Sequence, residues 1–180
     1  MTWFRSVHAA IVDSTGEGLP FPRSPEGADD SMDSTDLPAP TDLTSASPNE
    51  RIYAYQHELA KLPQIDLEAI PLFLPGIYIR TVVLPKGSSW TGKKHLYAHA
   101  SFVDGDVTVV AIDGEKRITG AHFFVSPAGT KRALYVHETT VWKTIHANPT
   151  EERDPEKLLD LFVVPETMEE VLAYKPKELQ

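Results

Sequence analysis

The chain has 180 residues and no cysteine, which excludes disulfide bonds, thiolate nucleophiles and cysteine-ligated metal centres. Long hydrophobic runs are also missing, because no window approaches the roughly 18 consecutive apolar residues of a membrane-spanning helix. The first residues lack the basic segment, apolar core and cleavage site of a secretory signal peptide. We therefore expect neither membrane insertion nor secretion through a signal peptide, and a cytoplasmic location fits the lack of cysteine.

Basic side chains are scarce: 17 lysines and arginines stand against 26 acids, giving a formal net charge of -9. This balance argues against a nucleic-acid-binding protein, which would need a basic surface. The negative charge is concentrated between Asp13 and Glu50, a stretch that contains one base, Arg23, and is rich in proline, serine and threonine. We expect residues 13–46 to form an acidic linker or extended arm, since they cannot bury enough apolar surface to fold alone.

Residues 1–12 form a short apolar segment ahead of this linker. One interpretation is a loosely ordered terminus, as chain termini often are. The other is an anchor that docks onto neighbouring protein chains, which residues 1–46 would then bind. In that interpretation the docking side chains are Trp3, Phe4, Val7 and Ile11.

Residues 47–180 are interpreted as the folded domain, which begins with a helix signal. Ser47 can cap a helix, Pro48 fits its first position, and Glu50 completes a capping box. The helix is predicted to end at about residue 62, with His57 on the surface. Its buried stripe consists of Ile52, Tyr55, Leu59 and Leu62. Two further short helices are predicted at about 154–161 and 168–172.

After residue 65 the hydrophobic pattern changes to a period of two, which predicts β-strands. The strand-like runs cover residues 77–84, 95–102, 107–112, 121–125, 132–136 and 140–146. The turn signals between them include Asp104-Gly105, Asp113-Gly114 and Glu138-Thr139. This succession of strands without intervening helices indicates a mainly β protein, an antiparallel sandwich or barrel, and it excludes Rossmann and TIM-barrel folds.

Three motifs lie on these predicted strands and turns. They read Pro85-Lys-Gly-Ser-Ser-Trp-Thr-Gly-Lys-Lys-His95, Ser126-Pro-Ala-Gly-Thr-Lys-Arg132 and His137-Glu-Thr-Thr-Val-Trp-Lys-Thr-Ile-His146. The chain thereby resembles the cupin superfamily, and in particular small cupin-like proteins encoded by phages and prophages. This resemblance implies a double-stranded β-helix, which is a small jelly-roll barrel, with its core at about residues 70–148.

The resemblance also implies a metal site, but the sequence departs from the family pattern. Many cupins use two histidines one residue apart, a glutamate, and a histidine after the Pro-x-Gly turn. Here His95 and His99 are four residues apart, which on a regular strand separates them by about 13 Å. Arg132 takes the position of the last histidine, and no acid occupies the place of the glutamate. An arginine stays protonated and cannot be a metal ligand.

Neighbouring strands offer further histidines that could restore a site. We consider His95, His99, His137 and His146 as pocket residues or as ligands of a divalent transition metal such as Fe, Mn, Ni or Zn. The alternative is that they are ordinary hydrogen-bonded barrel residues. Lys131 and Arg132 could bind a carboxylate or phosphate in the barrel, or else lie at a solvated strand end or pair with Glu138.

Two functional hypotheses follow from these patterns. The first, which the degraded metal motif favours, is a non-enzymatic jelly-roll interaction module, a virion-associated phage protein whose N-terminal arm binds neighbouring subunits. The second is a metal-dependent cupin that binds or transforms a small molecule in its barrel. A homo-oligomer is expected in either case, because the edges of a jelly roll need cover.

Overall fold

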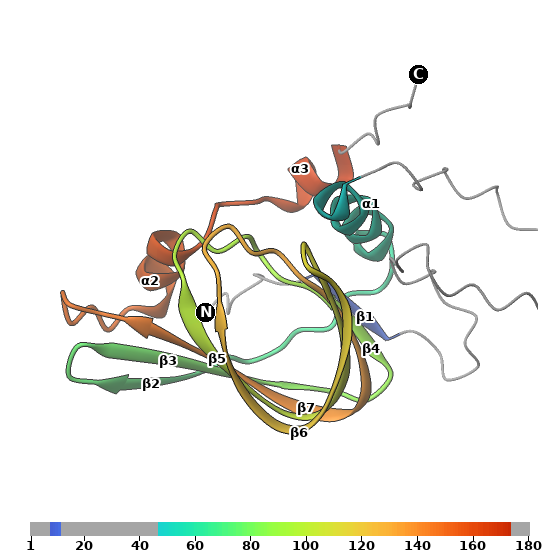
Figure 1. Ribbon diagram of the computed structural model, residues 1–180. Coiled ribbons are helices and arrows are strands. Elements are labelled where there is room, and N and C mark those ends of the chain that lie inside the picture. The colour runs from blue at the N-terminus through green and yellow to red at the C-terminus, as the bar shows by residue number, and fades with distance from the viewer. Residues whose placement is uncertain (1–7, 12–46, 174–180) are drawn as a thin grey trace, which may run out of the picture.

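The computed structural model describes residues 8–11 and 47–173. The described elements are β1 (His8–Ile11), α1 (Pro48–Ala60), β2 (Ile70–Leu74), β3 (Ile77–Leu84), β4 (Ser88–Thr91), β5 (His99–Ala111), β6 (Gly114–Ser126), β7 (Ala133–Ala147), α2 (Pro155–Phe162) and α3 (Met168–Ala173). All strand pairings are antiparallel. The chain is therefore mainly β, with short helices on either side of the strands in sequence, as predicted (Figure 1).

The sheet is organised around β7, the longest strand. Its first residues pair with β4, its second half pairs with β3, and β5 pairs with it on the other side. The strand order is β1-β4-β7-β3-β2, and β5 branches from it by pairing with β7 and carries β6 on its other side. Figure 1 shows that β5, β6 and β7 are strongly curved, as the strands of a barrel are. The fold is a jelly-roll barrel, which confirms the predicted fold class.

The strands β5 and β7 are longer than the sequence pattern suggests, because two predicted turns do not exist. Asp104-Gly105 lies inside β5, at a register irregularity, and Glu138-Thr139 lies inside β7. At this position the two strands approach closely, with the amide of Asp106 3.2 Å from the Thr140 hydroxyl. A bulge bends a strand without ending it, so the pattern of turn residues marks a barrel corner here. The hairpin turn before Gly114 is as predicted.

Three described strands, β1, β2 and β4, were not among the predicted runs. β2 pairs with β3 to form a hairpin at one edge of the sheet. β4 consists of Ser88–Thr91, whose four side chains are all buried although three of them are polar. The sequence of β4 lacks the apolar alternation that identifies a strand, since Trp90 is its one large apolar residue.

The helix α1 begins as predicted. The side chain of Ser47 accepts a hydrogen bond from the Glu50 amide, and the carboxylate of Glu50 accepts one from the Ser47 amide at 2.9 Å. Its buried face packs Ile52 and Tyr55 against the sheet. The predicted surface position of His57 is wrong: its side chain is 17% exposed, and its Nδ1 lies 3.0 Å from the carbonyl oxygen of Val171 in α3.

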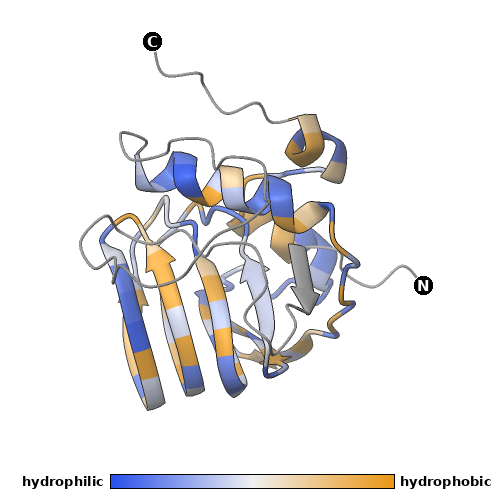
Figure 2. Cartoon of the chain, turned by 90° about the vertical axis from the view of Figure 1, so that its right-hand side faces the viewer, coloured by the Kyte–Doolittle hydropathy of each residue, from blue (hydrophilic) through white to orange (hydrophobic). Residues whose placement is uncertain are grey.

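The core lies between the curled sheet and the segment that precedes β2. It contains Trp90, Val103, Val107, Val136 and Trp142, all of them 7% exposed or less. Figure 2 shows the alternation of hydrophobic and hydrophilic residues along the strands that produces this one-sided burial. Among the helices that the structure describes, none has the length and apolar character to cross a membrane.

The N-terminal predictions fall mainly on residues outside the described ranges. Trp3, Phe4, Val7 and the linker 13–46 belong to this group. Ile11 lies in β1, whose backbone pairs with β4 of the same chain, opposite Ser88. The N-terminal segment thus supplies the edge strand beside β4.

Candidate metal and ligand site

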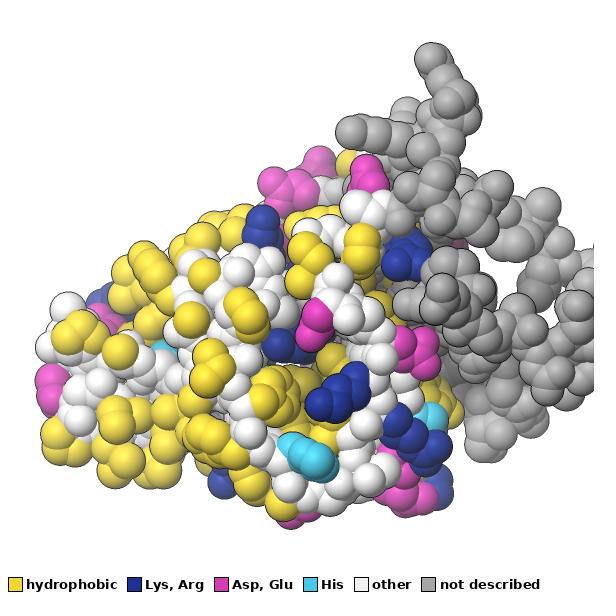
Figure 3. Space-filling view, in the orientation of Figure 1, with side chains coloured by type: hydrophobic (Ala, Val, Ile, Leu, Met, Phe, Trp, Pro, Cys, Tyr) yellow, Lys and Arg dark blue, Asp and Glu magenta, His cyan; other side chains and the backbone are white. Residues whose placement is uncertain are grey.

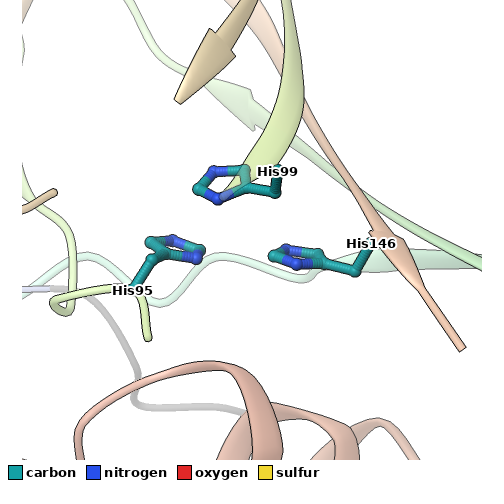
Figure 4. Close-up of side chains that lie close together, drawn as sticks. All are labelled: His95, His99 and His146. Carbon is teal, nitrogen blue, oxygen red and sulfur yellow. The ribbon is translucent and has the colours of Figure 1, made fainter. Parts of the chain in front are cut away.

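Three of the four candidate histidines come together at one end of the barrel. His99 is the first residue of β5, His146 lies near the end of β7, and His95 lies in the segment between β4 and β5. One ring nitrogen from each lies within 4.8 Å of the other two. Figure 4 shows the three imidazole rings gathered around a common centre, with a helix of the C-terminal part beneath them.

The chain between His95 and His99 is bent. The bend brings the two side chains close together, although four residues of a straight strand would hold them too far apart to bind one metal ion. The expected strand over 95–102 begins only at His99, and Leu96 and Tyr97 form a bend. The two ring centroids are consequently 4.0 Å apart, far closer than the approximately 13 Å of a straight strand. The prediction of a regular strand here is wrong.

The backbone of His95 is held from two sides. Its amide donates to the carbonyl of Thr130 at 3.0 Å, and its carbonyl accepts from the amide of Gly129 at 2.7 Å. On the other side His95 forms a β-bridge with Val163, at the end of α2. The Pro-x-Gly turn of the second motif therefore positions a histidine of the first motif.

The other two rings are oriented by their neighbours. The Nδ1 of His99 lies 3.3 Å from the carbonyl oxygen of Tyr97, and an Nδ1–H that donates to this carbonyl leaves Nε2 as the free acceptor. His146 is stacked on Phe162 of α2, with ring centroids 4.3 Å apart and planes at 10°. Stacking and hydrogen bonding of this kind fix rotamers before any ligand arrives.

Burial keeps these three imidazoles neutral. It lowers the pKa of His95 to about 2, with further lowering by His99, His146 and nearby arginines. It lowers the pKa of His146 to about 3. The pKa of His99 is also lowered by burial, against the opposing effect of the Tyr97 carbonyl. Neutral imidazoles have the protonation state that metal binding requires.

The cluster fits a transition metal ion with little adjustment. Three atoms within 4.8 Å of one another lie within about 2.8 Å of a common point, and a metal–nitrogen bond of about 2.1 Å requires each ring to move by less than about 1 Å. The Nδ1 of His95 is buried and has no hydrogen-bond partner among the described residues. No carboxylate belongs to the cluster in the described part of the chain. Three imidazoles therefore leave coordination positions open to a ligand.

His95 and His99 border a small cavity inside the barrel, of about 90 Å³. Its polar lining includes the cationic side chains of Arg80, Lys93 and Arg132, together with Thr130 and Thr144, and its apolar lining includes Trp90 and Trp142. No acid is among the lining residues that the structure describes. With a divalent ion present, this cavity would carry several positive charges and attract an anion.

His137 does not join the cluster. It lies on the opposite face of β7 from His146, since successive side chains of a strand alternate between faces. Its Nε2 lies 2.7 Å from the hydroxyl of Thr108, and its ring packs edge-on against Tyr135. The sequence left open a convergence of His137 with His99, and the structure shows that the two do not converge.

The two candidate anion-binding residues also separate. Arg132 lines the cavity and lies over the ring of Phe124 at 5.6 Å. Lys131 is directed away from it, with its ammonium 3.1 Å from the carboxylate of Glu166 and 4.7 Å from the ring centre of Tyr53. The sequence also allowed an ion pair of Lys131 or Arg132 with Glu138. This pair does not form, because Glu138 pairs with Lys86 at 2.6 Å.

One cationic residue of the cavity was not among the predicted site residues. Arg80 lies in β3, on the same face as Tyr78 and Val82, and burial lowers its pKa. The alternation from Ile77 onward could have identified it, because the inward positions of this strand are otherwise aromatic or aliphatic. Phe162, which stacks on His146, carries no comparable signal in the sequence.

No protein-family model matches the chain, and no curated protein is significantly similar to it. Solved structures with partial similarity include a cupin-2 domain protein from Shewanella frigidimarina, with 11% identity over 52% of this chain and 92% of that one and a TM-score of 0.37. KdgF from Halomonas sp. has 14% identity over 52% and 88%, with a TM-score of 0.41. The cupin domain of Schizosaccharomyces pombe Cnp3 has 17% identity over 52% and 74%, with a TM-score of 0.39. The fold assignment rests on the strand pairing of the chain itself, and no activity is carried over from these proteins.

Proposed function

We propose that the protein binds a divalent transition metal ion through His95, His99 and His146 and uses this site to bind a small anionic molecule inside the barrel. The observation that carries the proposal is the convergence of three neutral imidazoles from three separate segments, two of them buried (His99 and His146) and one half-buried (His95). Burying three imidazoles together without a common partner is costly, since each loses hydrogen bonds to water. A metal ion would replace those interactions for all three at once.

The ligand is expected to be an anion because the metal ion and the residues that line the cavity are positively charged. Three neutral histidines do not neutralise a divalent ion, and the lining adds Arg80, Lys93 and Arg132. An arginine near a metal ion is unfavourable unless a negative group lies between them. A carboxylate that coordinates the metal and also accepts hydrogen bonds from Arg132 would satisfy both requirements. The bound ion would supply Lewis acidity toward such an oxygen ligand.

The protein's own residues have simpler roles in this proposal. Arg132 binds and orients the anion, the two tryptophans exclude water, and Phe162 with Tyr97 holds the histidines in place. The cavity volume of about 90 Å³ suits a molecule of a few heavy atoms. Oxalate and inorganic phosphate are suitable probes because both are small anions and only the first chelates through two carboxylates.

Elemental analysis tests the metal directly. Protein expressed in medium supplemented with Mn, Fe, Ni and Zn is expected to carry close to one equivalent of metal per chain. Less than about 0.1 equivalent, with no binding on titration of the chelator-treated protein, would refute the proposal. Calorimetric titration of the metal-loaded protein with oxalate and then phosphate tests the ligand class.

The non-enzymatic, virion-associated module that the sequence pattern favours stays a prediction. It depends on residues 1–46, of which the structure describes only 8–11, and those pair with β4 of the same chain. The histidine cluster is the feature that favours the metal-dependent function over it.

A further inference from the structure

The outer face of the sheet is the second notable surface of the molecule, and it is separate from the cavity. Residues paired across antiparallel strands point to the same face. One such row crosses five strands and consists entirely of apolar residues: Val125, Ala100, Ile145, Ile79 and Leu72. The adjacent row consists of Phe123, Phe102, Lys143, Thr81 and Ile70. The inward residues of the same strands, such as Arg80 and Thr144, border the cavity.

Further apolar residues extend these rows toward the ends of the strands. They are Leu74 opposite Ile77, and Val83 opposite Val141. We call the seven most exposed side chains on this face the outer patch: Ile70, Leu72, Leu74, Ile77, Val83, Phe123 and Val125. Figure 3 shows hydrophobic side chains gathered at the lower left, where β2 and β3 lie.

The outer patch is large for the surface of a monomer. Its members are between 38% and 71% exposed. With roughly 200 Å² for a fully exposed large apolar residue, they present on the order of 700 Å², beyond the largest patch of a typical monomer and close to the roughly 800 Å² that each partner buries in a stable interface. An apolar patch of this size is typical of a surface that contacts another molecule.

We propose that the outer patch is the interface of a homodimer in which two copies of this chain pack sheet against sheet about a two-fold axis. A second copy fits because an interface across a two-fold axis must be complementary to itself. Two charged residues lie within these rows and have opposite signs. Lys143 lies in the row of Phe102, and Asp104 lies one row away, opposite Val141. About an axis between them, Lys143 of each copy faces Asp104 of the other.

Sedimentation velocity of the full-length protein tests the dimer. We expect the wild type to have the mass of two chains at micromolar concentration, and Leu72→Glu and Val125→Glu to have the mass of one. Ile112→Glu is the matched control, because Ile112 is 62% exposed but lies in the turn between β5 and β6. Circular dichroism melting confirms that each variant is folded. A monomeric wild type, or a Leu72→Glu variant that still dimerises, overturns the proposal.

Charge reversal tests the geometry. Lys143→Glu alone and Asp104→Lys alone should each weaken the dimer at least tenfold, because like charges then face each other across the axis. An equimolar mixture of the two variants should recover the wild-type affinity. Only contacts between chains explain such recovery, since within each variant chain residues 104 and 143 still carry the same sign. Failure of the mixture to associate more tightly than either variant overturns the proposed pairing. Neither outcome depends on metal binding.

Discussion

The imidazole rings of His95 and His146 are stacked with centroids 5.4 Å apart and planes at 6°, although β5, β6 and most of β7 separate the two residues in sequence. His99 lies against both, at 4.0 and 4.7 Å between centroids. The planes of His95 and His146 are nearly parallel, and that of His99 is tilted by 31° to the first and by 27° to the second. In the proposed function these three neutral rings are the preformed ligand set. Substitutions can test this ligand set, its surroundings and the barrel that positions it.

Removal of one histidine should abolish metal binding. His146→Gln is expected to lower the metal content from about one equivalent to below 0.1, because two imidazoles do not make a tight site. His137→Gln is the control, since His137 bonds to Thr108 outside the cluster and should retain full occupancy. Elemental analysis after gel filtration measures both. Equal loss of metal in the two variants would contradict this assignment of ligands.

Replacement of Arg132 should weaken the binding of the anion but not the binding of the metal. Arg132→Gln removes one of the three positive charges that line the cavity, and the affinity for oxalate is expected to fall at least tenfold, as for the loss of a charged hydrogen bond. Arg117→Gln provides a control, because Arg117 pairs with Asp106 on the surface. Calorimetry on the metal-loaded proteins gives both affinities. Unchanged oxalate binding by Arg132→Gln would mean that Arg132 does not bind the anion.

Chelator-treated protein should lose stability as the pH falls below 6.5. In the unfolded chain a histidine binds a proton near pH 6.5, whereas in the folded chain the pKa of His95 is about 2 and that of His146 about 3. Between these values the unfolded state binds more protons, so the free energy of unfolding decreases with falling pH, by up to about 1.4 kcal/mol per pH unit for each histidine.

Urea unfolding of the chelator-treated protein at several pH values between 4 and 7 measures this slope. The double variant His95→Gln/His146→Gln should have a distinctly smaller slope, even if its stability at neutral pH is lower. A slope equal to that of the wild type would mean that these two histidines do not titrate as their burial requires.

Gly105→Ala should destabilise the barrel strongly. Gly105 has a φ of 150°, and a Cβ there would lie 2.7 Å from Cα of Thr140 and still closer to its hydroxyl oxygen. Backbone cannot move aside easily, so we expect a loss of about 3 kcal/mol or more. Gly92→Ala is the matched control: a Cβ added at Gly92 would have nothing within 4 Å, and the φ of this residue is not positive. Denaturant unfolding measures the free energy of unfolding of both variants. Equal values would contradict the close contact between Gly105 and Thr140.

The buried pair Lys131–Glu166 should be more important for stability than the exposed pair Lys86–Glu138. The Lys131 side chain is 1% exposed, and its pKa is lowered by burial against the attraction of Glu166. Glu166→Gln removes the partner charge, and we expect a loss of about 3 kcal/mol. Lys86→Met, in which a 64% exposed lysine is replaced, should leave the unfolding midpoint unchanged. Equal midpoints for the two variants would mean that Lys131 finds another partner.

Local patterns alone determined much of this protein. The capping box at Ser47 and Glu50 defines where α1 begins, because it depends on residues three apart. The alternation over residues 77–84 gives the bounds of β3, and Asp113-Gly114 gives a true hairpin. The lack of helices between strands excludes α/β folds and indicates a sandwich or barrel. The jelly roll was implied by the resemblance of three motifs to those of cupins. Each of these features is encoded within a few neighbouring residues.

The histidine cluster and the outer patch depend on contacts that no local pattern contains. His95 joins His99 because the chain bends at Leu96 and Tyr97 and is held by Thr130 and Val163, and spacing alone predicted the opposite. Lys131 and Arg132 are adjacent in sequence, yet they point to different partners, and His137 faces away from His146 on one strand. Which side of a strand faces the barrel is decided by register and curvature, which arise only when distant strands pair. The sequence by itself therefore determined the elements and the candidate residues, and the tertiary structure decided which of those residues meet.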